Sequence, residues 1–149
     1  PLATRSIEAA LAASGLAPQR LELEIGECTL LAHPETATQL LQVLRARQVR
    51  STLTGFGSAR SVLGQLHALP FDKLKLEPAL LREGAATVHA MAALCHALGM
   101  LLGADGVESD ALLAALDAHA PVELQGELFG AYGPADAVPQ VCHALSAAA

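Results

Sequence analysis

Short apolar stretches alternate along the chain with segments whose apolar residues recur at helical spacing. The segment Leu21–Ile25 alternates polar and apolar residues, which is typical of a strand with two different faces. Apolar residues then follow on a single helical face, at Ala37, Leu40, Leu41 and Leu44. This change of period predicts a strand followed by a helix.

The same order of strand and helix recurs to the end of the chain. Strands are predicted at Leu21–Ile25, Val49–Leu53, Lys73–Leu76, Met100–Ala104 and Val122–Gln125. Helices are predicted at Ser6–Ala13, Pro34–Leu44, Ser61–Ala68, Val88–Cys95, Leu112–Leu116 and Pro134–Leu145. Such alternation predicts an α/β fold with a parallel sheet covered by helices.

Composition supports a packed domain without a nucleic-acid partner. Hydrophobic residues make up 52% and charged residues 16%, which is far from the disordered class. The formal net charge is −6, whereas a partner held by its phosphates requires a basic face. The short run Arg45, Arg47 and Arg50 is interpreted as a solvated face at a helix end.

Three cysteines, Cys28, Cys95 and Cys142, lie far apart and form no CxxC pair. This spacing indicates neither a zinc site nor a disulfide framework, so each cysteine is expected to be a small buried residue. A reducing cytoplasmic location fits this usage. No uncharged run is long enough to span a bilayer, so we expect no membrane contact by this segment.

Polar side chains stand at or just beyond the end of each predicted strand. In parallel α/β folds, functional residues collect at these carboxyl ends. The ends carry Glu24, Glu27, Thr54, Lys75, Glu77, Asp105, Glu108 and Gln125. Several oxygen-bearing residues in register indicate one shared site, of a kind suited to Mg²⁺ or Mn²⁺.

Four segments carry a family resemblance. LELEIGE (Leu21–Glu27) resembles the LELEITE segment of EAL-type cyclic di-GMP phosphodiesterase domains, and Leu53–Leu81 resembles the segment that begins LDDFG. His96–Ser109 is similar to HALGLRVVAEGVET, and Glu123–Gly130 is similar to VQGYLFG. The resemblance implies a (β/α)8 barrel, of which residues 1–149 supply the last five βα units as a single partial domain.

The resemblance also implies a metal-dependent reaction at the mouth of the barrel. In the family, two divalent cations, Mg²⁺ or Mn²⁺, activate a water that cuts one phosphodiester of cyclic di-GMP. Glu24 matches a metal-ligand glutamate, and Lys75 matches the active-site lysine near the attacking water. Asp105 stands where the family has a glutamate close to metal and water.

Three further positions match site residues of the family. Glu27 matches the glutamate that steadies the neighbouring loop, and Glu108 and Gln125 match two other site positions. Together with Glu24 and Lys75, these are the candidate ligand-binding residues.

The departures from the family pattern predict an inactive site. Thr54 and Gly55 replace the two aspartates of DDFG, of which the first bridges both metals in the family. Two close cations then repel each other with too little compensation. Asp105 is also one methylene shorter than glutamate, so Glu24, Lys75 and Asp105 are interpreted as vestigial and no bound cofactor is expected.

The family's first three strands and the motif EAL are also missing from the sequence, as in a fragment or a natural remnant. Three functions stay open: an inactive module acting through protein contacts, a non-hydrolysing receptor for cyclic di-GMP, or an active phosphodiesterase or its fragment. Stacking residues for the nucleotide are scarce, with Tyr132 the one tyrosine. Two unpaired strand edges predict self-association or a second protein partner.

Non-functional interpretations are weighed beside these. Lys75 could pair with Glu24 or Asp105, and Gln125 could be a buried amide satisfied by the backbone. His96 and His143 are expected at the surface of helices.

Overall fold

The computed structural model describes residues 2–57, 62–116, 122–131 and 133–147, and its centre is a parallel five-stranded sheet. The strands follow chain order across the sheet, so β1 and β5 form its two edges. Their bounds are β1 Glu22–Gly26, β2 Arg50–Thr54, β3 Lys73–Leu76, β4 Leu101–Ala104 and β5 Val122–Leu124. Each predicted strand is confirmed to within one residue at either end, and so is the α/β class.

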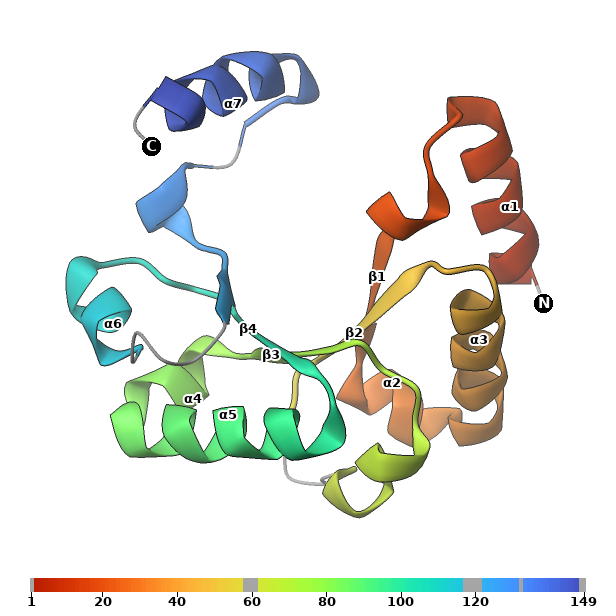
Figure 1. Cartoon of the computed structure of the whole chain (residues 1–149), viewed down its shortest axis with the longest axis horizontal. Helices are drawn as coiled ribbons and strands as arrows, with labels where there is room; N and C mark the ends of the chain where they lie inside the picture. Colours follow the sequence, from red (N-terminus) through yellow and green to blue (C-terminus); the bar gives the residue numbers. More distant parts are fainter. Residues whose placement is uncertain (1, 58–61, 117–121, 132, 148–149) are drawn as a thin grey trace.

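Helices cover one face of this curved sheet. In Figure 1, α2 to α6 lie along its outer side, α1 lies beside α3, and α7 stands at the other end of the arc. The α-helices are α1 Leu2–Ser14, α2 Glu27–Ala32, α3 Pro34–Ala46, α4 Pro78–Arg82, α5 Ala85–Leu98, α6 Asp110–Ala115 and α7 Val138–Ala147. The 3-10 helices are η1 Pro18–Arg20, η2 Leu63–Ala68, η3 Glu127–Phe129 and η4 Ala135–Ala137.

The structure differs from the predicted helices in four places. The short helices α2 and α4 were not predicted, because five or six residues are too few to show a helical period. The helix expected over 61–68 is the 3-10 helix η2, which ends shortly before Pro70; residues 58–61 lie outside the described part. The last helix begins later than expected, since residues 135–137 form η4 and α7 starts at Val138.

Strand alternation sorts side chains onto two faces of the sheet. The outer face is apolar and packs against the helices; Leu53, Leu74, Leu76, Leu102 and Ala104 are each at most 1% exposed. Burying one such leucine contributes roughly 2 kcal/mol to folding. The inner face of the curve carries polar residues at the alternate positions, so the strands deliver charged groups to one concave surface.

The expected burial of the cysteines is wrong for two of the three. Cys95 on α5 is buried, and burial raises the pKa of its thiol to about 11. Cys28 and Cys142 are exposed on helices, and no disulfide joins the three, all of which lie in the described part of the chain. No helix in that part is long and apolar enough to cross a membrane.

Candidate functional site

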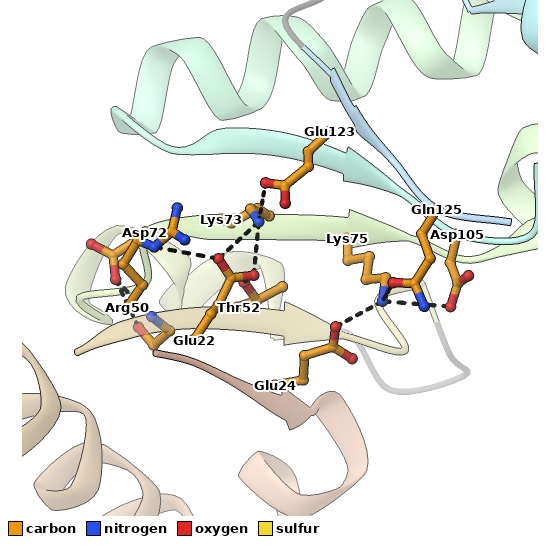
Figure 2. Close-up of polar contacts among 11 residues, drawn as sticks. Glu22, Glu24, Arg50, Thr52, Asp72, Lys73, Lys75, Asp105, Glu123 and Gln125 are labelled. Carbon is orange, nitrogen blue, oxygen red and sulfur yellow. Dashed lines mark hydrogen bonds and ion pairs between the residues drawn. The ribbon is translucent and has the colours of Figure 1, made fainter. Parts of the chain in front are cut away.

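Four predicted site residues meet around the ammonium group of Lys75. Its Nζ donates to Oε1 of Glu24 at 2.7 Å and to Oε1 of Gln125 at 2.8 Å. Oδ2 of Asp105 lies 3.6 Å from the same nitrogen. Figure 2 shows these groups converging from β1, from the end of β5 and from the turn after β4. The predicted pairing of Lys75 with Glu24 or Asp105 is therefore confirmed, and it involves both.

The environment of Lys75 favours its charged form. Its side chain is 9% exposed, and burial alone lowers the pKa of an ammonium group. The hydrogen bond and the charge of Glu24, followed by Asp105, outweigh burial, so the net pKa of Lys75 is raised. Lys75 is thus a cation held by two hydrogen bonds and one further carboxylate.

A second ionic cluster lies directly beside the one around Lys75, and it was not predicted from the sequence. We call the cluster around Lys75 the first layer and this one the second layer. Nζ of Lys73 donates to both carboxylate oxygens of Glu22, at 2.7 and 2.9 Å, and to Glu123. Oγ1 of Thr52 donates to Glu22 at 2.7 Å, and Nε of Arg50 lies 3.7 Å from that carboxylate (Figure 2). Glu22, Lys73 and Glu123 stand two positions before Glu24, Lys75 and Gln125. Both layers therefore share one face of the sheet.

The signal for this layer is present in the sequence. Polar residues recur two positions apart on three strands, in LELEI, KLKL and ELQ. Side chains at i and i+2 of a strand point to the same face. The first member of each pair lies before the carboxyl end of its strand, where functional residues are not usually expected.

Charge pairing favours the ionised forms of Glu22 and Lys73 in the second layer as well. Burial raises the pKa of Glu22, but the hydrogen bonds from Lys73 and Thr52 and the nearby cations lower it overall. Burial lowers the pKa of Lys73, but Glu123 and Glu22 raise it overall. A cavity of about 230 Å³ is lined by both layers.

The loop after β2 is fixed by two carboxylates. Glu27 is fully buried, and its Oε1 accepts a hydrogen bond from the backbone N–H of Val62 at 3.0 Å. Oε1 of Glu77 accepts from the backbone N–H of Gly55 at 2.8 Å, and Gly55 adopts a left-handed φ of 68°. The position of the second family aspartate is thus occupied by a glycine whose backbone binds Glu77.

Not every predicted residue joins the cluster around Lys75. Glu27 faces the loop after β2 instead, and Glu108 is exposed, with no hydrogen bond or ion pair to that cluster among the described residues. Gln125 is exposed and bound by Lys75, so its interpretation as a buried amide satisfied by the backbone is wrong. The expected exposure of His96 and His143 is confirmed. Tyr132 lies outside the described residues.

The three arginines of the run are exposed, as expected for a solvated stretch at a helix end. Arg47 pairs with Glu8 and so links α1 to α3, whereas Arg50 approaches Glu22 in the second layer. Arg45 lies in the last turn of α3, where a cation offsets the helix dipole.

The donor set does not fit a pair of divalent cations. No group of three or more His, Cys, Asp or Glu side chains that could hold a metal occurs in the described ranges. Glu24 is engaged by Lys75, and Oδ1 of Asp105 accepts from the backbone N–H of Gly106 at 2.7 Å. Thr54 offers only a neutral hydroxyl, which is a weak ligand for Mg²⁺ or Mn²⁺.

A parallel sheet of successive βα units, with acidic, lysine and amide groups gathered at its strand ends, defines an α/β domain of the parallel barrel type. The sequence model of the EAL domain matches residues 1–132. The chain belongs to the EAL domain family.

Known relatives agree with this membership. An uncharacterised signalling protein of Caulobacter vibrioides is 34% identical over 134 residues, which cover 86% of this chain and 17% of that protein. The bifunctional diguanylate cyclase/cyclic di-GMP phosphodiesterase MucR of Pseudomonas aeruginosa is 32% identical over 137 residues, covering 88% of this chain and 20% of MucR. The chain therefore spans about a fifth of the length of these curated relatives.

Solved structures show the same arrangement. The phosphodiesterase of MucR in complex with cyclic di-GMP matches with a TM-score of 0.79 and 30% identity, over 90% of this chain and 57% of that one. The EAL domain of DcpA from Mycobacterium smegmatis matches with a TM-score of 0.76 and 30% identity, over 84% of this chain and 58% of that one. The five βα units correspond to rather more than half of an EAL barrel.

Proposed function

We propose that this chain is a catalytically inactive EAL module that acts in cyclic di-GMP signalling through contacts with other proteins. One observation carries the proposal. The ammonium group of Lys75 is hydrogen-bonded to the Glu24 carboxylate at 2.7 Å, while Thr54 and Gly55 stand where the family has two acidic metal ligands. Two neighbouring divalent cations need several anionic oxygens to offset their mutual repulsion. The described residues supply too few, so a metal-activated water has no support here.

A second candidate function is binding of cyclic di-GMP without hydrolysis. Its support is the pairing of Lys75 with Gln125 beside a cavity of about 230 Å³, and the cyclic di-GMP complex of the similar MucR phosphodiesterase. An ammonium group and an amide are suitable donors to phosphate oxygens. Glu24 and Asp105 oppose this function, because their carboxylates repel the same phosphates.

A hydrolysis assay tests the first proposal. The purified chain is incubated with cyclic di-GMP and Mg²⁺ or Mn²⁺, and linear pGpG is measured by chromatography. We expect no product above a no-protein control, with the MucR phosphodiesterase as positive control. Metal-dependent pGpG that disappears in Lys75→Ala would overturn the proposal.

Calorimetry separates the two candidates. We expect no heat of binding from cyclic di-GMP, with or without Mg²⁺, if the module works through protein contacts alone. Saturable binding without turnover, weakened at least tenfold by Lys75→Ala, would instead support the receptor.

Assembly is part of the first proposal. The chain is proposed to fold as one unit over residues 1–149 and to work in the cytoplasm. The edges of β1 and β5 carry backbone groups that can pair with another chain, so self-association is the simplest protein contact. Light scattering at micromolar concentration is expected to give at least twice the mass of one chain. A monomer with a cooperative melt would contradict self-association.

A further inference from the structure

Two lysines of β3 each connect the two edge strands of the sheet. Lys73 binds Glu22 on β1 and Glu123 on β5, and Lys75 binds Glu24 on β1 and Gln125 just beyond β5. In the hydrogen-bonded order of the sheet, β1 and β5 are separated by β2, β3 and β4. The edges are therefore joined across the concave face by side chains alone, as Figure 2 shows.

Of the two lysines, Lys73 makes the more complete connection. Its side chain is 5% exposed, and its ammonium group binds both oxygens of Glu22 as well as Glu123. Lys75 makes a single bond to each edge. On β1 its partner Glu24 is 49% exposed against 20% for Glu22, while at the β5 edge the partners of both lysines, Glu123 and Gln125, are exposed. Buried charged hydrogen bonds are stronger than exposed ones, because water competes less for the donors.

The backbone of β4 is shaped to let Lys73 cross it. Gly103 pairs with Glu123 in the strand register, and a Cβ atom added at Gly103 would lie 3.2 Å from Cδ of Lys73. Glycine thus leaves room for the stem of Lys73 on its way from β3 to Glu123. This fit is independent of the ion pairs themselves.

We propose that Lys73 is a positioning residue for Lys75: by holding Glu22 and Glu123 together, it keeps β1 and β5 at the separation at which Glu24 and Gln125 both reach the Lys75 ammonium group. Glu24 and Gln125 each lie two residues after a partner of Lys73 along the chain, so the spacing of one layer fixes that of the next. Without Lys73, the Glu22 and Glu123 carboxylates repel each other and the edges move apart. The proposal does not depend on whether cyclic di-GMP binds.

The test observes the Lys75 ammonium group directly, without any ligand. The chain is labelled with ¹⁵N-lysine, its two buried ammonium signals are assigned with Lys73→Met and Lys75→Met, and proton exchange is measured by NMR. In Lys73→Met we expect the Lys75 protons to exchange about tenfold faster, as for loss of one charged hydrogen bond. An unchanged rate in a variant with a native backbone spectrum would overturn the proposal.

The sign of a titration separates positioning from simple charge removal. Loss of the positive charge of Lys73, with nothing moved, would raise the pKa of Lys75, because a neighbouring cation disfavours a second one. Loss of the Glu24 and Gln125 contacts lowers it. We expect a lower pKa of Lys75 in Lys73→Met, and a higher one would overturn the proposal.

Milder variants keep the proposal testable if Lys73→Met fails to fold. Glu123→Gln changes an exposed carboxylate and removes the tie to β5 only, so the contact between Lys75 and Gln125 should weaken while that with Glu24 stays. Glu127→Gln removes the same charge from an exposed position four residues on and should leave Lys75 unchanged. Equal behaviour of Glu123→Gln and Glu127→Gln at Lys75 would overturn the proposal.

Discussion

The buried carboxylate of Glu27 accepts a hydrogen bond from the backbone N–H of Val62, thirty-five residues further along the chain, at 3.0 Å. This bond attaches the start of α2 to the end of the loop that follows β2. Glu27→Ala leaves a buried donor without its acceptor and is expected to lower the free energy of unfolding by about 2 kcal/mol. Glu27→Gln keeps an acceptor oxygen and should cost less. Urea denaturation measures both; equal losses would contradict a role for the hydrogen bond.

Gly126 is predicted to tolerate no side chain. A Cβ atom there would lie 2.2 Å from the backbone oxygen and 2.4 Å from the backbone nitrogen of Val107, and backbone cannot move aside cheaply. Gly126→Ala should therefore lower the free energy of unfolding by about 3 kcal/mol. Gly64→Ala is the control, because no heavy atom lies within 4 Å of its added Cβ. Similar melting temperatures for the two variants would disprove the steric argument.

Restoring the two family aspartates is predicted not to restore turnover. The double change Thr54→Asp and Gly55→Asp adds two carboxylates, but Gly55 has a φ of 68°, a conformation that costs a residue with a side chain about 1 kcal/mol. Gly55→Asp alone should therefore be less stable than Thr54→Asp alone in urea denaturation. Production of pGpG by the double variant would show that the remaining residues suffice for metal catalysis.

Stability should depend on pH through the two ionic layers. The pKa of Glu22 is lowered in the folded chain. Its contribution to the free energy of unfolding is therefore full above its ordinary pKa of 4.5 and is lost as pH falls below that value. The pKa values of Lys73 and Lys75 are raised, so their contributions are full below 10.5 and are lost as pH rises beyond it. Melting temperature against pH should show a plateau between these limits. In Glu22→Gln the melting temperature should fall less steeply at low pH. The same fall as in the unchanged chain would contradict the contribution of Glu22.

Strand positions and the α/β class could be predicted from the sequence because they depend on local period. The alternation of LELEI and KLKL fixes which side chains share a face, whatever the neighbouring strands do. The short helix α2 could not be predicted in this way, since its six residues give no period and its place depends on the buried Glu27 and Leu30. Exposure of Cys28 was likewise invisible, because it depends on which side of α2 meets the core.

The candidate site also has a part that the local sequence determines and a part that depends on tertiary packing. The sequence by itself determined that Glu24, Lys75, Asp105 and Gln125 stand at strand ends, and that Thr54 and Gly55 are not acidic. Only the tertiary structure decided that Lys73 meets Glu22 and Glu123 at once, since these residues are about fifty positions apart on either side. Their meeting depends on the curvature of the sheet, which brings two edge strands within reach of one side chain. Curvature arises from the packing of all the helices and strands together, and no local sequence pattern records it.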